Sequence, residues 1–162
     1  SFPNFLCSFI FYISAYTLSM VKIIRTFDFS ANDFFDYIED SLTKEIKKAR
    51  NNNKNVKIAA GTRYALKGRD GTINTKVVIN KFERNKIYSA TFTSLGEVVT
   101  ADYATKDTNK GCKITLTEDI QTYDPEQHNK LANLFYDFMY HRSAQEELNK
   151  LANGVQKFKE KR

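Results

Sequence analysis

Cysteine and histidine are scarce in this sequence, with two of each among 162 residues. Cys7 and Cys112 form no CxxC pair and have no histidine nearby at ligand spacing, which argues against a disulfide framework and against a zinc site. We therefore expect a reduced, cytoplasmic protein in which Cys112 is a small core residue.

Motifs that carry chemistry are also missing. The sequence contains no GxSxG, no P-loop and no GxGxxG, and no two carboxylates stand with a histidine at metal spacing. We expect no catalytic residue set, no metal ligands and no cofactor.

Long runs of one charge are absent as well. The chain carries 25 lysines and arginines against 19 aspartates and glutamates, a net charge of +6, but no five basic residues are consecutive. This balance mildly favours anionic partners, whereas specific nucleic-acid binding is not expected.

Residues 1–19 contain no charged side chain, and every charge lies beyond Met20. A signal peptide would need a positive start and a cleavage site. A membrane span would need about 20 apolar residues, which Pro3 and Asn4 interrupt. Upstream sequence read by mistake, with Met20 as the true initiator, is the interpretation we favour. We expect residues 20–162 to form one domain, which has no membrane span and is long enough for a single core.

The order of periodicities predicts the fold. Alternation over residues 21–27 indicates a strand, and Ser30 with Asp33 indicates the start of a helix. That helix carries an apolar stripe and, opposite it, an acidic face expected to be solvated. The stripe is Phe34, Phe35, Ile38, Leu42 and Ile46, and the acidic face is Asp36, Glu39, Asp40 and Glu45.

Period-two segments joined by short turns follow and predict an antiparallel meander. The expected strands start at Val56, Ile73, Tyr88, Val99 and Cys112, and Gly61 is expected to mark a bulge or a close backbone approach.

Pro125 is expected to open a final helix that Gly154 and a basic end close. Its apolar stripe turns by roughly 90–100° after Met139, which predicts a bend near residues 140–144. The order of elements therefore predicts an α+β fold, a curved antiparallel sheet wrapped around a long C-terminal helix.

Three segments carry a family resemblance: FDFSANDFFDYIEDSL from Phe27, GTRY from Gly61 and ITLTED from Ile114. They resemble the helix-grip superfamily of START-type lipid-transfer domains, birch-pollen-type allergens and polyketide cyclases. More narrowly, they are similar to a bacterial family known as a domain of unknown function. The resemblance implies a sheet of six or seven strands, neighbouring first and last strands, an apolar pocket against the last helix, and no catalytic residues.

Alternation and the helical stripe together suggest which side chains face that pocket. Glu118 shares a face with Leu116, and Arg25 breaks the inward face of the first strand, so the resemblance allows a pair between Arg25 and Glu118. A solvent-exposed Glu118 is the alternative. His141 is either a ligand-binding group or an ordinary core or rim residue. The expected ligand-binding set is Arg25, Tyr64, Tyr88, Phe92, Tyr103, Leu116, Glu118, Phe138 and His141.

Three functions remain open at this point. The first is binding of a small hydrophobic or amphipathic ligand in an internal cavity. The second is an interaction protein whose own aromatics fill the core and whose basic rim meets an acidic partner. The third is a cyclase- or hydrolase-like enzyme in which Glu118 and His141 act as acid and base. The basic rim comprises Lys44, Lys47, Lys48, Arg50 and Lys54. The sequence sets no oligomeric state.

Overall fold

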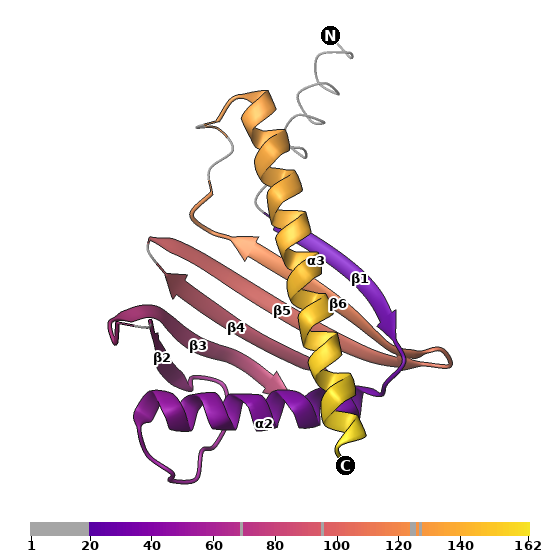
Figure 1. Ribbon diagram of the computed structural model, residues 1–162. Coiled ribbons are helices and arrows are strands. Elements are labelled where there is room, and N and C mark those ends of the chain that lie inside the picture. The colour runs from indigo at the N-terminus through magenta and orange to yellow at the C-terminus, as the bar shows by residue number, and fades with distance from the viewer. Residues whose placement is uncertain (1–19, 69, 95, 124–125, 127) are drawn as a thin grey trace.

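The computed structural model describes residues 20–68, 70–94, 96–123, 126 and 128–162. The prediction for residues 1–19 lies outside the described residues. The elements, in chain order, are β1 (Met20–Phe27), α2 (Ala31–Arg50), β2 (Arg63–Lys67), β3 (Ile73–Glu83), β4 (Ile87–Ser94), β5 (Glu97–Thr108), β6 (Gly111–Ile120) and α3 (Lys130–Glu160) (Figure 1).

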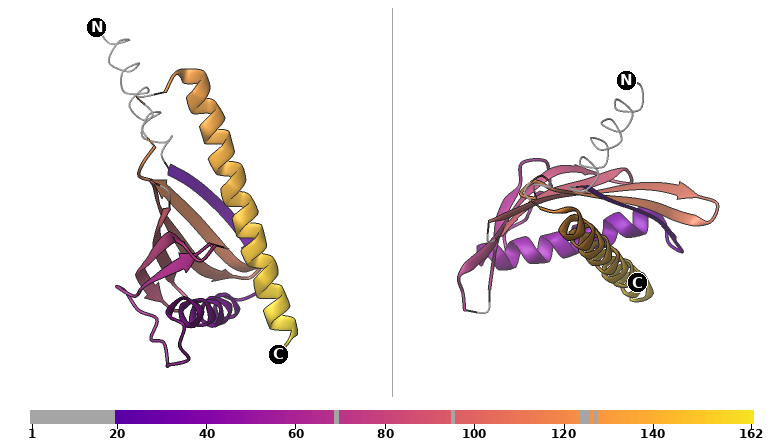
Figure 2. Two further views of the ribbon diagram at one scale, coloured as in Figure 1. Left: turned by 60° about the vertical axis from the view of Figure 1, so that its left-hand side comes forward. Right: turned by 90° about the horizontal axis from the view of Figure 1, so that it is seen from above.

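The strands form one antiparallel sheet in the order β1-β6-β5-β4-β3-β2. Consecutive strands from β2 to β6 pair as hairpins. Strand β1 pairs with β6 and forms the sheet edge opposite β2; in this pair Val21 lies opposite Glu118 and Phe27 lies opposite Cys112. The sheet is curved and both helices lie on its concave side (Figure 2). The predicted α+β class, with a helix after the first strand and a long C-terminal helix, is confirmed.

Helix α2 begins where the sequence predicts. The Asp33 N–H donates to Ser30 Oγ at 3.0 Å, and the Ser30 N–H donates to Asp33 Oδ2 at 3.0 Å. This reciprocal capping satisfies two donors that would otherwise be left unpaired at the helix start. The apolar stripe of α2 is buried against the sheet, as predicted.

The second predicted strand is shorter than its alternation suggests. We expected it to start at Val56, but β2 starts at Arg63. Thr62 Oγ1 accepts from the Ala59 N–H and donates to the Lys57 carbonyl, which folds the preceding segment into a turn. Gly61, with φ of +90°, then donates its N–H to the Ile79 carbonyl at 2.8 Å. Alternation here reflects partial burial of a loop and not strand pairing.

Helix α3 is continuous from Lys130 to Glu160 and follows a straight course (Figures 1 and 2), so the bend predicted at residues 140–144 is wrong. The predicted start at Pro125 lies outside the described residues. The N-terminal part of α3 extends beyond the sheet (Figures 1 and 2), and its large apolar side chains, Leu131, Leu134, Phe138 and Met139, are exposed. The second part is buried through Ala144, Leu148, Ala152 and Val155. The helix needs no bend because only one of its two stripes packs on the sheet.

Charged side chains tie the two helices to the turn between β3 and β4. Arg84 contacts Asp36 and Glu39 at 2.6 Å each, and Arg162 contacts the other oxygen of Asp36 at 2.6 Å. The acidic face of α2 is therefore only partly solvated. Single exposed ion pairs contribute little, but this network links three separate segments at one place.

Gly154 lies inside α3 and does not close the helix, contrary to the prediction. A Cβ at this position would lie 2.5 Å from Cζ of Tyr37 on α2. The Tyr37 ring also meets Phe158 edge-on, with centroids 5.9 Å apart. A side chain at this position, where the two helices cross, would have to displace the Tyr37 ring from its contact with Phe158.

Gly154→Ala should therefore destabilise the protein, although alanine gains about 1 kcal/mol of helix propensity over glycine. Overpacking of this kind costs about 1–3 kcal/mol, so we expect a net loss of unfolding free energy in urea titrations.

The matched control is Asn153→Ala, at an exposed neighbouring position, which should be neutral or slightly stabilising. Adding Tyr37→Ala to Gly154→Ala should cost less than the two single changes added together. Equal stability of the two alanine variants would contradict the crossing argument.

Candidate functional site

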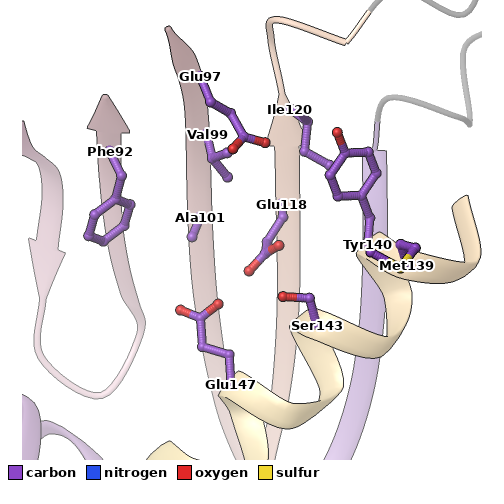
Figure 3. A pocket seen from close by; sticks show the side chains of 10 residues that line it. All are labelled: Phe92, Glu97, Val99, Ala101, Glu118, Ile120, Met139, Tyr140, Ser143 and Glu147. Carbon is purple, nitrogen blue, oxygen red and sulfur yellow. The ribbon is translucent and has the colours of Figure 1, made fainter. Parts of the chain in front are cut away.

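Two adjoining hollows lie between the concave face of the sheet and the helices. The first, here the carboxyl hollow, has a volume of about 510 Å³ (Figure 3). It is lined by Phe92, Glu97, Val99, Ala101, Glu118, Ile120, Met139, Tyr140, Ser143 and Glu147. Exposed residues on α3, Ser143 and Glu147, form part of its rim, so the hollow opens to solvent along the helix.

The second, here the tyrosine hollow, has a volume of about 370 Å³ and shares Phe92 and Glu147 with the first. Its remaining lining is Tyr37, Ile38, Ser41, Leu42, Glu45, Tyr64, Tyr88, Tyr103, Lys150 and Leu151. The floor is made by residues of strands β2, β4 and β5, and the walls are made by α2 and α3.

The sheet register places Glu118 in the carboxyl hollow. Glu118 on β6 lies between Val21 of β1 and Ala101 of β5. Alternation turns all three toward the concave face. Because the Ala101 side chain is a single methyl group, space remains above the strand, and Glu118 points into it toward α3 (Figure 3).

Glu118 is 8% exposed and forms a hydrogen bond with Glu147 of α3. Burial is the largest cause that raises the pKa of Glu118, from its ordinary 4.5 to about 8; the hydrogen bond and the negative charges of Glu147 and Glu97 add to it. Glu118 is thus mainly protonated at neutral pH and can donate its proton to Glu147.

Glu147 joins the two hollows. It accepts a hydrogen bond from the Tyr103 hydroxyl at 3.0 Å as well as from Glu118. Glu147 is not among the site residues that the sequence predicts. Its position next to Leu148 and three residues after Ala144, both on the buried stripe, is the signal that places Glu147 at the edge of the sheet-facing surface.

The tyrosine hollow has buried rings with hydroxyls at its surface. The Tyr64 hydroxyl donates to Glu45 Oε2 at 2.6 Å, and the rings of Tyr88 and Tyr103 stack with centroids 5.9 Å apart. Burial is the main cause that raises the pKa of each tyrosine well above its usual value, and nearby carboxylates reinforce it. The hydroxyls therefore stay protonated. Glu45, expected to be solvated, is here a wall residue.

The structure brings five of the nine expected residues to these hollows. Tyr64, Tyr88 and Tyr103 line the tyrosine hollow, Glu118 lines the carboxyl hollow, and Phe92 lines both. Leu116 is fully buried, and it is not among the residues that line either hollow.

Arg25 does not pair with Glu118. Arg25 lies opposite Ile114, four residues along β6 from Glu118, and its Nη1 donates to Asn149 Oδ1 at 3.0 Å. It is exposed at the outer edge of the sheet, beneath α3. The group that faces Glu118 is therefore not the expected positive charge of Arg25 but a second carboxyl group, that of Glu147.

Phe138 and His141 also lie outside the described linings. Phe138 is 62% exposed, on the part of α3 that projects past the sheet, and His141 is half-buried. Phe138 precedes the turn of the helical stripe after Met139, which explains its exposure; His141 follows that turn, so the stripe alone does not explain its position. Glu118 and His141 thus do not line one hollow, as the acid–base pair of an enzyme would require.

In the described part of the chain, no three histidine, cysteine or acidic side chains come close enough together to hold a metal ion. Cys112 is buried, and burial raises the pKa of its thiol to about 11. A thiol with this pKa is a poor nucleophile at neutral pH.

The raised pKa of Glu118 predicts a pH-dependent stability. Between about pH 5 and 8 the folded protein keeps a proton that the unfolded chain releases, so the free energy of unfolding should fall as pH rises, with a slope of at most about 1.4 kcal/mol per pH unit. Glu118→Gln removes the titrating group, so its stability advantage over wild type should grow from pH 5 to pH 8. Urea unfolding followed by circular dichroism measures both curves.

Asp119→Asn is the matched control, since Asp119 is the next residue on β6 and points to the opposite face of the sheet. This variant should keep the wild-type slope. Parallel curves for wild type and Glu118→Gln would show that Glu118 is not held protonated.

Solved structures share this fold. The chain is similar to SA2116 of Staphylococcus aureus (TM-score 0.61, 15% identity, covering 87% of this chain and 95% of that one). It is similar to MLL2253 of Mesorhizobium loti (TM-score 0.58, 15% identity, 85% and 97%). It is also similar to Ara h 8.0201, a Bet v 1-like allergen (TM-score 0.59, 11% identity, 86% and 95%). The expected helix-grip fold is therefore confirmed.

Sequence comparison gives a more specific result than the comparison of folds. No curated protein matches the chain. In the described residues, neither helix combines the length and the apolar composition that crossing a bilayer requires. Residues 21–141, three quarters of the sequence, match the family described as a domain of unknown function, DUF3284, and the chain belongs to that family.

Proposed function

We propose that this protein binds a small amphipathic molecule in the two adjoining hollows. The observation that carries the proposal is the composition of their lining, where aromatic rings and aliphatic side chains surround a few hydrogen-bonding groups. Ligand sites have this composition, because apolar walls supply contact area and a few polar groups fix orientation. A cytoplasmic location, in line with the free Cys112, belongs to the same proposal.

The size of the hollows supports a molecule of modest dimensions. Their volumes, about 510 and 370 Å³, lie in the range typical of small-molecule sites. The polar groups converge at the place where the hollows meet, with Glu147 between Glu118 and the Tyr103 hydroxyl. The bound molecule would place its polar end there and its apolar part against the rings.

Filling the carboxyl hollow from α3 tests this proposal. Ser143→Phe adds a ring at an exposed rim position without entering the core, so it should weaken binding of the neutral fluorescent probe N-phenyl-1-naphthylamine about tenfold or more. Titration of the full chain with probe gives the affinity, and native mass spectrometry of freshly purified protein reports any retained ligand.

Gln145→Phe is the matched control, because it adds the same ring at an exposed α3 position that is outside both linings. It should leave the probe affinity unchanged. Equal affinities in the two phenylalanine variants would mean that the probe binds elsewhere, for example on the exposed apolar side chains of the first part of α3, and would contradict the proposal.

A second candidate function rests on the end of α2. Lys44, Lys47 and Lys48 line a surface hollow of about 380 Å³ together with Asn51, Asn52 and Asn53. This basic rim would suit an acidic partner. If it acts in this way, polyglutamate should bind at low salt and Lys48→Glu should weaken that binding. An unchanged affinity would leave the basic residues as a solvated helix end that complements the helix dipole.

A further inference from the structure

We propose that the ligand of the carboxyl hollow is an organic cation, a primary or quaternary amine with an apolar body, whose ammonium group lies between Glu118 and Glu147. This inference rests on the proposed binding function and specifies the chemical class of the ligand.

The first argument is the sign of the charge in this hollow. Glu97, Glu118 and Glu147 supply three carboxyl groups, while the described lining contains no lysine, arginine or histidine. This contrasts with the chain as a whole, whose net charge is +6. Among the described residues that line the two adjoining hollows, Lys150 is the only basic one, and it belongs to the tyrosine hollow. The carboxyl hollow is thus a local negative site on a positive protein.

The second argument is the burial of Glu118 without a cationic partner. At 8% exposure, a carboxyl group normally pairs with a positive group or with several donors. Glu118 instead faces another carboxyl, and its charge is suppressed by burial and by that neighbour. An ammonium group between Glu118 and Glu147 would supply the missing counter-charge and let both carboxyls ionise.

The third argument is the remaining wall of the hollow. Phe92 and Tyr140 present aromatic rings, and Val99, Ile120 and Met139 present apolar side chains around the carboxyls (Figure 3). Aromatic faces attract cations and also pack against the apolar part of an amine. A bare Mg²⁺ or Ca²⁺ ion would gain nothing from such walls, and these ions prefer six or more oxygen ligands. The combination selects an organic cation.

Binding of such a cation would be linked to proton release. The titratable groups around Glu118 are Glu97 and Tyr103 from β5, and Glu147 and Tyr140 from α3; all of them are carboxyls or phenols. From β1 and β5, Val21 and Ala101 lie beside it. None of these groups can neutralise Glu118 as an anion, so the incoming ammonium would displace its proton. Amine affinity should therefore rise with pH up to about 8 and then level off.

Three probes with the same phenylbutyl body test the inference by isothermal titration calorimetry on the full chain. They are 4-phenylbutylamine, 4-phenylbutan-1-ol and 4-phenylbutyrate, which carry a cationic, a neutral and an anionic head group. A primary amine stays protonated below about pH 10. At pH 8 the amine should bind about tenfold tighter than the alcohol, and the carboxylate should bind weakest.

Two variants assign the effect to the carboxyl pair. Glu118→Gln and Glu147→Gln keep the side-chain shape, so each should lower amine affinity about tenfold while leaving alcohol affinity within about twofold. Glu147 is exposed, so its variant tests the pair even if a change at buried Glu118 alters folding. Asp119→Asn, on the opposite face of β6, should leave all three affinities unchanged.

The outcomes separate this inference from the proposed function. Alcohol binding that Ser143→Phe abolishes supports the binding function whatever the head-group preference. Equal affinities for the three probes, or tightest binding of the carboxylate, would overturn the cation inference and leave the binding function in place. Amine affinity that is independent of pH between 6 and 8 would overturn it as well. Failure of all three probes to bind would overturn both.

Discussion

The antiparallel pairing of β1 with β6 is the interaction on which the rest of the structure depends. It joins the first described strand to the last one, over the full length from Met20 to Phe27. The pairing fixes where α2 starts, because α2 follows β1 after only a short turn. It also places Glu118 in an interior position of the sheet, between β1 and β5. Without β1, Glu118 would lie on an edge strand, where water could solvate its charge.

Burying the carboxyl group of Glu118 costs free energy of folding, and the described residues around it offer no positive charge that would offset this cost. An apolar side chain of similar volume would pack beside Ala101 and Ile120 without desolvating a carboxyl group. The two glutamates instead share one hydrogen bond and keep Glu118 neutral, which limits the penalty. Its position therefore agrees with the proposed role in ligand binding better than with a stabilising role. A buried polar group in an otherwise apolar core is a departure from the usual pattern that is often found at functional sites.

Local sequence patterns predicted the helices and strands well, but they did not predict which part of α3 packs against the sheet. The Ser30 cap, the stripe of α2 and the hairpin order follow from short-range rules, and the structure obeys them. The strand start expected at Val56 and the bend expected near Tyr140 are wrong for a related reason. Periodicity shows which side chains are apolar together, but it does not show whether a partner lies opposite them. Part of α3 has no sheet beneath it, and this depends on the relative lengths of sheet and helix in three dimensions.

The same reasoning explains which site residues the sequence could identify. Alternation correctly turned Tyr64, Tyr88 and Tyr103 toward the concave face, and each ring is largely buried while its surface borders the hollow. The rings complete the core, while the hydroxyls of Tyr64 and Tyr103 bond to carboxylates of the helices. Those carboxylates, Glu45 and Glu147, come from helices whose rotation about their own axes only tertiary packing determines. A strand pattern predicts the floor of this site, whereas its acidic walls depend on how the helices dock.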